Sequence, residues 1–129
     1  MTTSCVLDVS AAAAILFREP DGLRVAPGLF LMKRVVVPQI FHLELANVAR
    51  TKVRRREIDR PRAEELLRET SSWPIEVRPV AWENAWGVSM EHELTVYDAA
   101  YLHLALEVRV PLLTLDAQLI AAAGRRSLL

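Results

Sequence analysis

Four acidic residues are widely separated in the chain, and the apolar neighbours of the first three would turn those three toward the interior. The four acids are Asp8, Glu44, Asp98 and Asp116. Carboxylates gathered inside a protein need a cation or must hold protons, because an unpaired buried charge is strongly unfavourable. Neither lysine of the chain lies near any of the four in sequence. The four acids together therefore indicate a divalent metal site, and ligation by oxygen alone favours Mg²⁺ or Mn²⁺ over zinc.

Each acid also has a purely structural interpretation. Asp116, at an expected strand-to-helix junction, is a residue type that helices favour as N-cap. Asp98 follows Thr95 by three residues, which is the spacing of a capping box. The structural interpretation is weaker for Glu44, on the apolar stripe of a helix, and for Asp8, in an apolar strand where Asp is disfavoured. The metal-site prediction rests on the four occurring together.

The elements that would position these acids alternate between short strands and helices. Strands are expected at residues 4–9, 35–37, 75–79 and 112–115. Helices are expected at 11–17, capped by Ser10, at 23–32 as an interrupted helix or two short ones, and at 39–54, 61–70, 82–91, 95–110 and 116–123. This order predicts one α/β domain over residues 1–129, with a central parallel sheet of four to five strands. All four acids map to the carboxyl edge of such a sheet, where ligands bind.

Composition narrows the class of protein. The chain has 129 residues, 52% of them hydrophobic and 25% charged, which excludes intrinsic disorder and suffices for one core. No apolar run approaches the ~18–20 residues that cross a bilayer, and the start lacks the features of a signal peptide. A single cysteine, Cys5, excludes an internal disulfide framework. We therefore expect a cytoplasmic protein with no membrane partner.

Four short motifs carry the acids. They are Leu7-Asp8-Val9-Ser10, the segment Phe41–Asn47 around Glu44, Tyr97–Leu102 around Asp98, and Leu113-Thr114-Leu115-Asp116. In this order they resemble the PIN-domain ribonucleases, and most of all the VapC-type toxins of bacterial toxin–antitoxin pairs. The resemblance covers nearly the whole chain and implies a PIN-like three-layer α/β/α fold. The family usually ends in a further strand, whereas this chain stops at Leu129, so a fifth strand is expected to be short or missing.

The resemblance also implies roles for individual residues. The four acids would hold one or two Mg²⁺ or Mn²⁺ ions, while Thr114 and Ser10 would orient a carboxylate or a water by hydrogen bonding. The implied activity is metal-dependent endoribonuclease hydrolysis of RNA, leaving 5′-phosphate and 3′-hydroxyl ends. As the toxin of a pair, the free protein would inhibit translation and growth. Its implied partners are a VapB-type antitoxin and a second copy, in a homodimer and a toxin–antitoxin hetero-oligomer. Trp82, Trp86 and the apolar segment Leu23–Met32 could form core, an interface or both, and the helical spacing of the tryptophans favours core.

A protein of zero net charge needs a local basic surface to bind RNA. The segment Arg50–Arg62 contains seven basic residues and two acidic ones. An arginine can bind two phosphate oxygens at once, so Arg54 and Arg55 are candidate RNA contacts. The alternative is an ordinary solvated junction between two helices.

Two other classes of protein compete with the nuclease. A signalling receiver domain also carries acids at strand ends, but it usually needs adjacent acids after the first strand and a lysine near the last one. Here Val9 follows Asp8, and no lysine lies beyond Lys52, which disfavours that class. A catalytically silent PIN-like module that only binds protein partners is the remaining alternative, and the complete set of acids argues against it.

Overall fold

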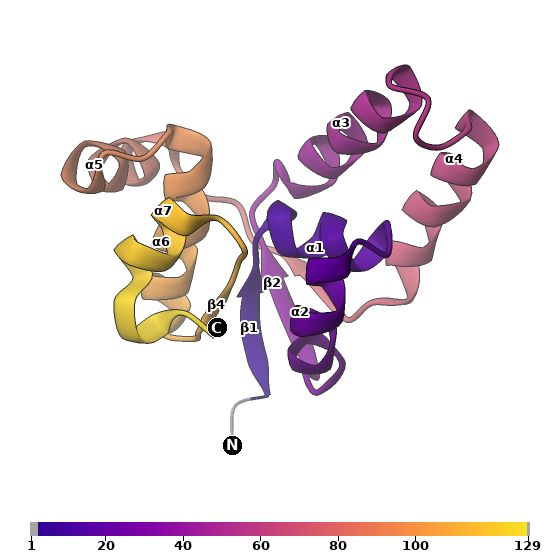
Figure 1. Cartoon of the computed structure of the whole chain (residues 1–129). Helices are drawn as coiled ribbons and strands as arrows, with labels where there is room; N and C mark the ends of the chain where they lie inside the picture. Colours follow the sequence, from indigo (N-terminus) through magenta and orange to yellow (C-terminus); the bar gives the residue numbers. More distant parts are fainter. Residues whose placement is uncertain (1–2, 129) are drawn as a thin grey trace.

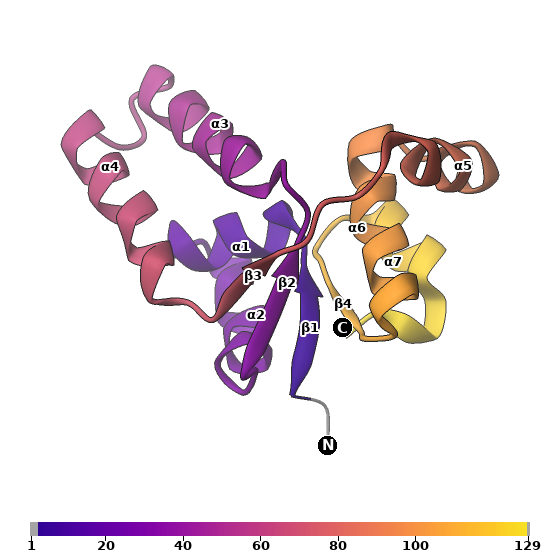
Figure 2. The same cartoon turned by 180° about the vertical axis from the view of Figure 1, so that it is seen from behind.

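A four-stranded parallel sheet forms the centre of the fold (Figures 1 and 2). The computed structural model describes residues 3–128. Its strands are β1 (Ser4–Leu7), β2 (Arg34–Val37), β3 (Ile75–Val77) and β4 (Leu112–Leu113), in the order β3-β2-β1-β4. The central strands β1 and β2 are buried beyond their first residues, which explains their nearly continuous apolar sequence. The predicted α/β class with a parallel central sheet is confirmed.

Helices cover both faces of the sheet. They are α1 (Val9–Leu16), α2 (Pro20–Phe30), α3 (Phe41–Arg54), α4 (Arg60–Glu69), α5 (Trp82–His92), α6 (Val96–Val108) and α7 (Ala117–Ala123), with short 3₁₀ turns at Thr70–Ser72 and Gly124–Arg126. Helices α1 to α4 lie on one side and α5 to α7 on the other (Figures 1 and 2). The helical connection from β1 to β2 therefore crosses one face of the sheet, and the connection from β3 to β4 crosses the other face. The switch point, where an open parallel sheet binds ligands, lies between the carboxyl ends of β1 and β4.

Two predicted details of the first helices are wrong. The N-cap of α1 is Asp8, whose side chain accepts from the backbone N–H of Ser10, so Ser10 lies inside the helix. The segment predicted as interrupted is one continuous helix, α2, although it contains Pro27. Tertiary packing holds it together: Val25 and Leu29 are buried, and a Cβ on Gly22 would lie 2.2 Å from a backbone oxygen of α1. Burial of one face thus outweighs the hydrogen bond that a proline removes.

The end of the chain supplies a remnant of a fifth strand. Ser127 forms an isolated parallel bridge with Leu112, and Leu128 donates a backbone hydrogen bond to the same residue at 2.9 Å. The expectation of a short fifth strand therefore holds for the described residues. Within residues 3–128 the structure contains no helix of the length and apolarity that a membrane span requires.

The two tryptophans of α5 are exposed, contrary to the expectation that they pack in the core. Trp82 is 71% and Trp86 54% exposed, whereas Ala85 and Ser89 form the buried side of the helix. Small residues on that side let α5 pack closely on α6. The tryptophans therefore belong to the surface.

Candidate active site

Asp8 and Thr114 meet where the two strands at the switch point end. Leu7 of β1 is paired with Leu113 of β4, and the Asp8 backbone N–H donates to the Leu113 carbonyl at 3.0 Å. This register brings the residues after the two strands together. The Thr114 hydroxyl, fully buried, donates to Asp8 Oδ2 at 2.8 Å.

Ser10 makes a second link between the same strand ends. Its hydroxyl donates to Asp8 Oδ2 at 2.5 Å and accepts the backbone N–H of Leu115 at 2.9 Å. The Thr114 oxygen accepts the backbone N–H of Asp116 at 3.0 Å in the same manner. Each hydroxyl thus fixes the Asp8 side chain to the loop after β4. The structure contains the hydrogen bonds predicted for Ser10 and Thr114, while their part in a reaction stays a prediction.

The two oxygens of Asp8 have different surroundings. Oδ2 accepts the hydrogen bonds of Ser10 and Thr114, whereas Oδ1 is buried and has no hydrogen-bond partner among the described residues. The side chain is almost completely buried, and this desolvation raises the pKa of the Asp8 carboxyl, with the hydroxyl hydrogen bonds acting in the opposite direction. A buried carboxylate oxygen without a donor is costly unless a cation or a proton completes it. Asp8 Oδ1 is therefore the atom of this site that most needs a ligand.

Glu44 reaches the site from α3 and is held by Tyr101 of α6. The Tyr101 hydroxyl donates to Glu44 Oε1 at 2.6 Å. Desolvation raises the pKa of Glu44; the Tyr101 hydrogen bond lowers it, and the charges of Asp8 and Asp98 raise it further. Burial and the Glu44 acceptor together keep the pKa of Tyr101 far above its ordinary value, so it stays a neutral donor. Sequence reasoning missed Tyr101, although a tyrosine on the apolar face of a helix needs a polar partner for its hydroxyl.

Asp98 lies in the first turn of α6, one turn before Tyr101. Thr95 is the N-cap of this helix, and its oxygen accepts the backbone N–H of Asp98 at 3.1 Å. The Asp98 carboxyl is half-buried. Desolvation raises its pKa, and the charges of Asp8 and Asp116 raise it further.

Asp116 is the N-cap of α7, as its structural interpretation predicts. Its Oδ1 accepts the backbone N–H of Leu119 at 3.0 Å. The same carboxylate contributes to the raised pKa of Asp98. Capping and membership of the acidic site are thus compatible for this residue.

The four acids lie around one edge of the sheet. Their charges interact: the charge of Asp8 raises the pKa of both Glu44 and Asp98, and the charge of Asp116 also raises the pKa of Asp98. They do not form a preassembled ligand cluster, since within residues 3–128 no three His, Cys, Asp or Glu side chains are grouped so as to hold one ion. The arrangement is therefore a set of neighbouring carboxylates, of which Asp8 is the most buried.

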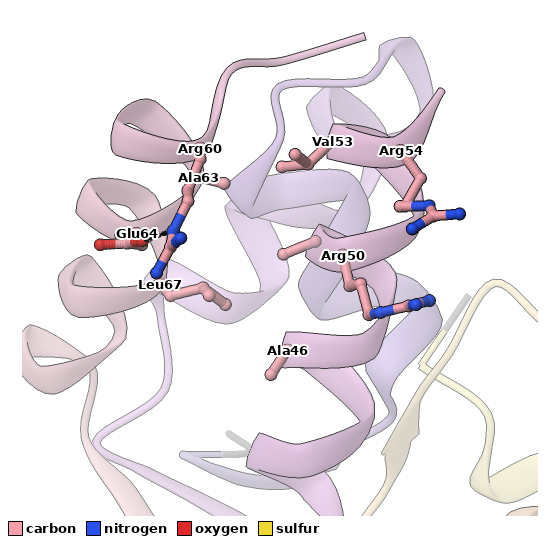
Figure 3. A pocket seen from close by; sticks show the side chains of 9 residues that line it. Ala46, Arg50, Val53, Arg54, Arg60, Ala63, Glu64 and Leu67 are labelled. Atoms are coloured by element: carbon pink, nitrogen blue, oxygen red, sulfur yellow. Dashed lines mark hydrogen bonds and ion pairs between the residues drawn. The ribbon is translucent and has the colours of Figure 1, made fainter. Parts of the chain in front are cut away.

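The candidate RNA contacts Arg54 and Arg55 lie at the far end of α3, about 15 Å from Glu44 along the helix axis at 1.5 Å per residue. Arg54 lines a groove of ≈ 250 Å³ between α3 and α4, with a floor formed by small and apolar side chains. Figure 3 shows the guanidinium groups of Arg50 and Arg54 pointing away from α4, while Arg60 lies against Glu64. Arg55 lines a different hollow on α3. The two arginines therefore lie on different surfaces of the protein.

Comparisons with known proteins agree with this geometry. The family model described as PIN domain matches residues 5–125. Ribonuclease VapC1 from two strains of Mycobacterium tuberculosis, CDC 1551 / Oshkosh and ATCC 25618 / H37Rv, is 32% identical over 124 residues, covering 93% of this chain and 91% of the relative. The crystal structure of PAE2754 from Pyrobaculum aerophilum superposes with a TM-score of 0.77 at 22% identity, covering 96% of this chain and 89% of that one, and so supports the fold. The chain therefore belongs to the PIN domain family, and within it is related to the VapC-type ribonucleases.

Proposed function

We propose that this protein is a metal-dependent endoribonuclease that acts as the toxin of a toxin–antitoxin pair. The observation that carries the proposal is Oδ1 of Asp8, a buried carboxylate oxygen without a hydrogen-bond donor at the switch point of the sheet. The surrounding donors are carboxylates, which are the ligands that Mg²⁺ and Mn²⁺ prefer. Family membership and the likeness to a ribonuclease support the same activity.

The donor chemistry of the carboxylates suits one or two divalent ions, although among the described residues they are not grouped as ligands of a single ion. Asp8, Glu44, Asp98 and Asp116 would hold them, and Asp8 Oδ1 is the oxygen that no hydrogen bond occupies among the described residues. A bound ion of this kind lowers the pKa of water and neutralises charge on a scissile phosphate.

The chain itself supplies positioning. Ser10 and Thr114 both donate to Asp8 Oδ2, which leaves Oδ1 for the ion, and Tyr101 fixes one oxygen of Glu44. Cys5 is no nucleophile, because burial raises the pKa of its thiol to about 12. The resemblance to the family implies that water attacks the phosphorus and that the bond to the 3′ oxygen breaks, which leaves the RNA with 5′-phosphate and 3′-hydroxyl ends.

An RNA cleavage assay tests this function. Purified protein is incubated with labelled RNA in Mg²⁺ or Mn²⁺, with and without EDTA, alongside Asp8→Asn and Asp98→Asn. The matched control is Asp59→Asn: Asp59 caps α4, away from the carboxylate edge, and Asn caps helices equally well. We expect cleavage that EDTA and both site variants abolish and that the control retains. Cleavage indifferent to EDTA and to both substitutions would contradict the mechanism.

The toxin role implies two protein partners in the cytoplasm, a VapB-type antitoxin and a second copy of this chain. An antitoxin could block the site by presenting an arginine to the carboxylates. Expression in cells should arrest growth, and Asp8→Asn or co-expression of the antitoxin should relieve the arrest.

One observation favours the alternative, a catalytically silent module. Among residues 3–128 the carboxylates are not grouped as ligands of one ion. A silent module would bind its partner, and Mn²⁺ would induce no cleavage of any RNA. The cleavage assay therefore separates the two functions directly.

A further inference from the structure

A second feature of the carboxylate edge is a pocket that shares Glu44 with it. The pocket has a volume of ≈ 410 Å³ and lies between α3 and the start of α6. Its walls include Leu43, Val48 and the side chain of Tyr97, and Asn47 adds an amide. Leu43 is 75% and Tyr97 62% exposed, so the apolar wall is open to solvent. Tyr97 immediately precedes Asp98 in the chain. The pocket therefore adjoins the acidic site both at Glu44 on α3 and next to Asp98 on α6.

The lining indicates what the pocket would hold. It contains no basic residue, and Glu44 contributes negative charge, so a phosphate is disfavoured there. A neutral, planar group with apolar faces and a polar edge suits an aromatic ring, aliphatic walls and one amide. A nucleobase has these properties: it stacks on tyrosine and forms hydrogen bonds through its edge.

We infer that this pocket receives one unpaired base of the RNA substrate beside the cleavage site, with Tyr97 as the stacking residue and Asn47 as the edge contact. The inference rests on the proposed ribonuclease function and adds to it a binding pocket for one base next to Glu44. A base engaged in a duplex is stacked and paired and must first be extruded at an energetic cost, so a single strand or a loop places a base here more readily.

The surface beyond the pocket supports a path for the rest of the strand. A second hollow of ≈ 400 Å³ shares Asn47 and Val48 with the pocket and continues along α3 to Arg55. Lys52 in this hollow is paired with Glu19 at 2.5 Å, whereas Arg55 makes no ion pair with any residue of the described chain. Arg55 is therefore available for a phosphate of the strand, about 12 Å along the helix from Asn47.

Binding measurements test the base pocket apart from cleavage. The protein carries Asp8→Asn, so the RNA stays intact, and the probe is a short, unstructured, fluorescein-labelled RNA followed by fluorescence anisotropy. Tyr97→Ala should weaken binding roughly tenfold, in the range of one lost stacking contact. Tyr97→Phe keeps the ring and should restore it. The matched control, Phe30→Ala, removes an aromatic side chain that is 72% exposed, against 62% for Tyr97, from the end of α2 and should bind normally.

The RNA can be altered in the complementary way. The probe is replaced by a series of RNAs of the same sequence, each lacking the base at one position. At one position the missing base should weaken binding to the Asp8→Asn protein by the same factor of about ten. The same abasic RNA should bind the Tyr97→Ala variant as tightly as the intact RNA binds that variant, because the ring on which the base would stack is already absent. The same strand in a duplex should bind more weakly to the parent, by at least the same factor.

The path along α3 has its own measurement. Arg55→Ala should weaken binding and reduce the slope of log Kd against log salt by about 0.7, the value for one phosphate contact of a single strand. Arg24→Ala, which removes an exposed arginine of α2, should leave the slope unchanged.

Each outcome bears on one proposal. If RNA is cleaved but Tyr97→Ala binds like the parent and the abasic series is flat, the base pocket is refuted and the nuclease function stands. If binding discriminates as expected but no RNA is cleaved with Mn²⁺, the nuclease function fails and the pocket stands. If Tyr97→Ala changes the oligomeric state in light scattering and leaves RNA affinity unchanged, the pocket is a protein interface and the inference is overturned.

Discussion

The hydroxyl of Tyr101 donates a hydrogen bond to Oε1 of Glu44 at 2.6 Å, across 57 residues of sequence. The contact joins α6 to α3 over the carboxyl edge of the sheet. It also joins the motif that carries Asp98 to the motif that carries Glu44. Two of the four acids thus depend on the same buried ring for their relative position.

Tyr101→Phe removes this contact and keeps the ring. We expect kcat for RNA cleavage to fall about tenfold or more, because a hydrogen bond to a charged group contributes about 1.5–3 kcal/mol and Glu44 would lose its fixed orientation. Cleavage rates and melting temperatures of both proteins provide the test. An unchanged kcat would show that Glu44 does not need Tyr101. A lowered melting temperature with unchanged kcat would assign the contact to stability alone.

The general architecture and the placement of the acids could be predicted from the sequence. Short apolar runs separated by amphipathic segments specify parallel strands with helical crossovers, and such sheets bring the residues after their strands to one edge. Capping was predictable in part: Thr95 and Asp116 each accept a backbone N–H at the start of a helix, whereas Ser10, the cap expected for α1, lies inside the helix behind Asp8. These features depend on local sequence, so local reasoning suffices for them.

The features that depended on packing were not predictable. Trp82 and Trp86 have the spacing of a buried stripe, but the buried side of α5 is set by its close contact with α6. Pro27 favours a break in the helix, yet the buried side chains Val25 and Leu29 keep α2 continuous. The Tyr101 hydrogen bond needs the distance between two helices, which no motif encodes. Each of these required the tertiary structure.

Thr114→Val tests how much the position of the Asp8 side chain depends on the hydrogen bond from the Thr114 hydroxyl. Valine has a similar shape but cannot donate to Asp8 Oδ2 or accept from the Asp116 N–H. We expect the free energy of unfolding to fall by about 1–3 kcal/mol, the cost of unsatisfied buried groups, and cleavage to fall with it. Thr114→Ser should restore both. Thr70→Val removes a buried hydroxyl that bonds a backbone carbonyl of α4, so it should lower stability and leave cleavage intact.

Divalent ions should stabilise the protein through Asp8. At a concentration of 100 times Kd, an ion that binds only the folded state adds about 2.7 kcal/mol. Thermal unfolding in Mg²⁺ or Mn²⁺ should therefore show a rising melting temperature for the parent and for Asp59→Asn, and none for Asp8→Asn. Equal shifts in all three proteins would place ion binding elsewhere.

In EDTA the contribution of Asp8, Glu44 and Asp98 to stability should fall as pH rises above about 4, whereas Glu76, whose pKa the Arg34 hydrogen bond lowers, acts in the opposite direction. The folded state raises the pKa of Asp8, Glu44 and Asp98, first by desolvation and, for the latter two, also by neighbouring charge. A group with a raised pKa binds its proton more tightly when folded, so the folded state is favoured at low pH. The contribution of these three groups to the free energy of unfolding should decline from the unfolded-state pKa, about 4, through the raised folded values. Asp98→Asn should flatten this decline and leave the protein in EDTA at least as stable at neutral pH. Chemical denaturation of the parent and of Asp98→Asn across pH measures both, and the same pH dependence in the two proteins would contradict the shift assigned to Asp98.

The exposed face of α5 is where we expect a second copy to bind. Trp82, Trp86 and Met90 recur every four residues and are 71%, 54% and 63% exposed, so they form one apolar row along the helix. Contiguous apolar surface of this kind marks protein interfaces, and tryptophan is enriched among the residues that dominate them. Size-exclusion chromatography with light scattering should give a dimer at micromolar concentration for the parent and a monomer for Trp86→Glu, because a charge would be buried at the interface. Leu23→Glu places the same charge on a comparably exposed apolar position of α2 and should remain dimeric. A monomeric parent would contradict the homodimer, and a dimeric Trp86→Glu would place the interface on another face.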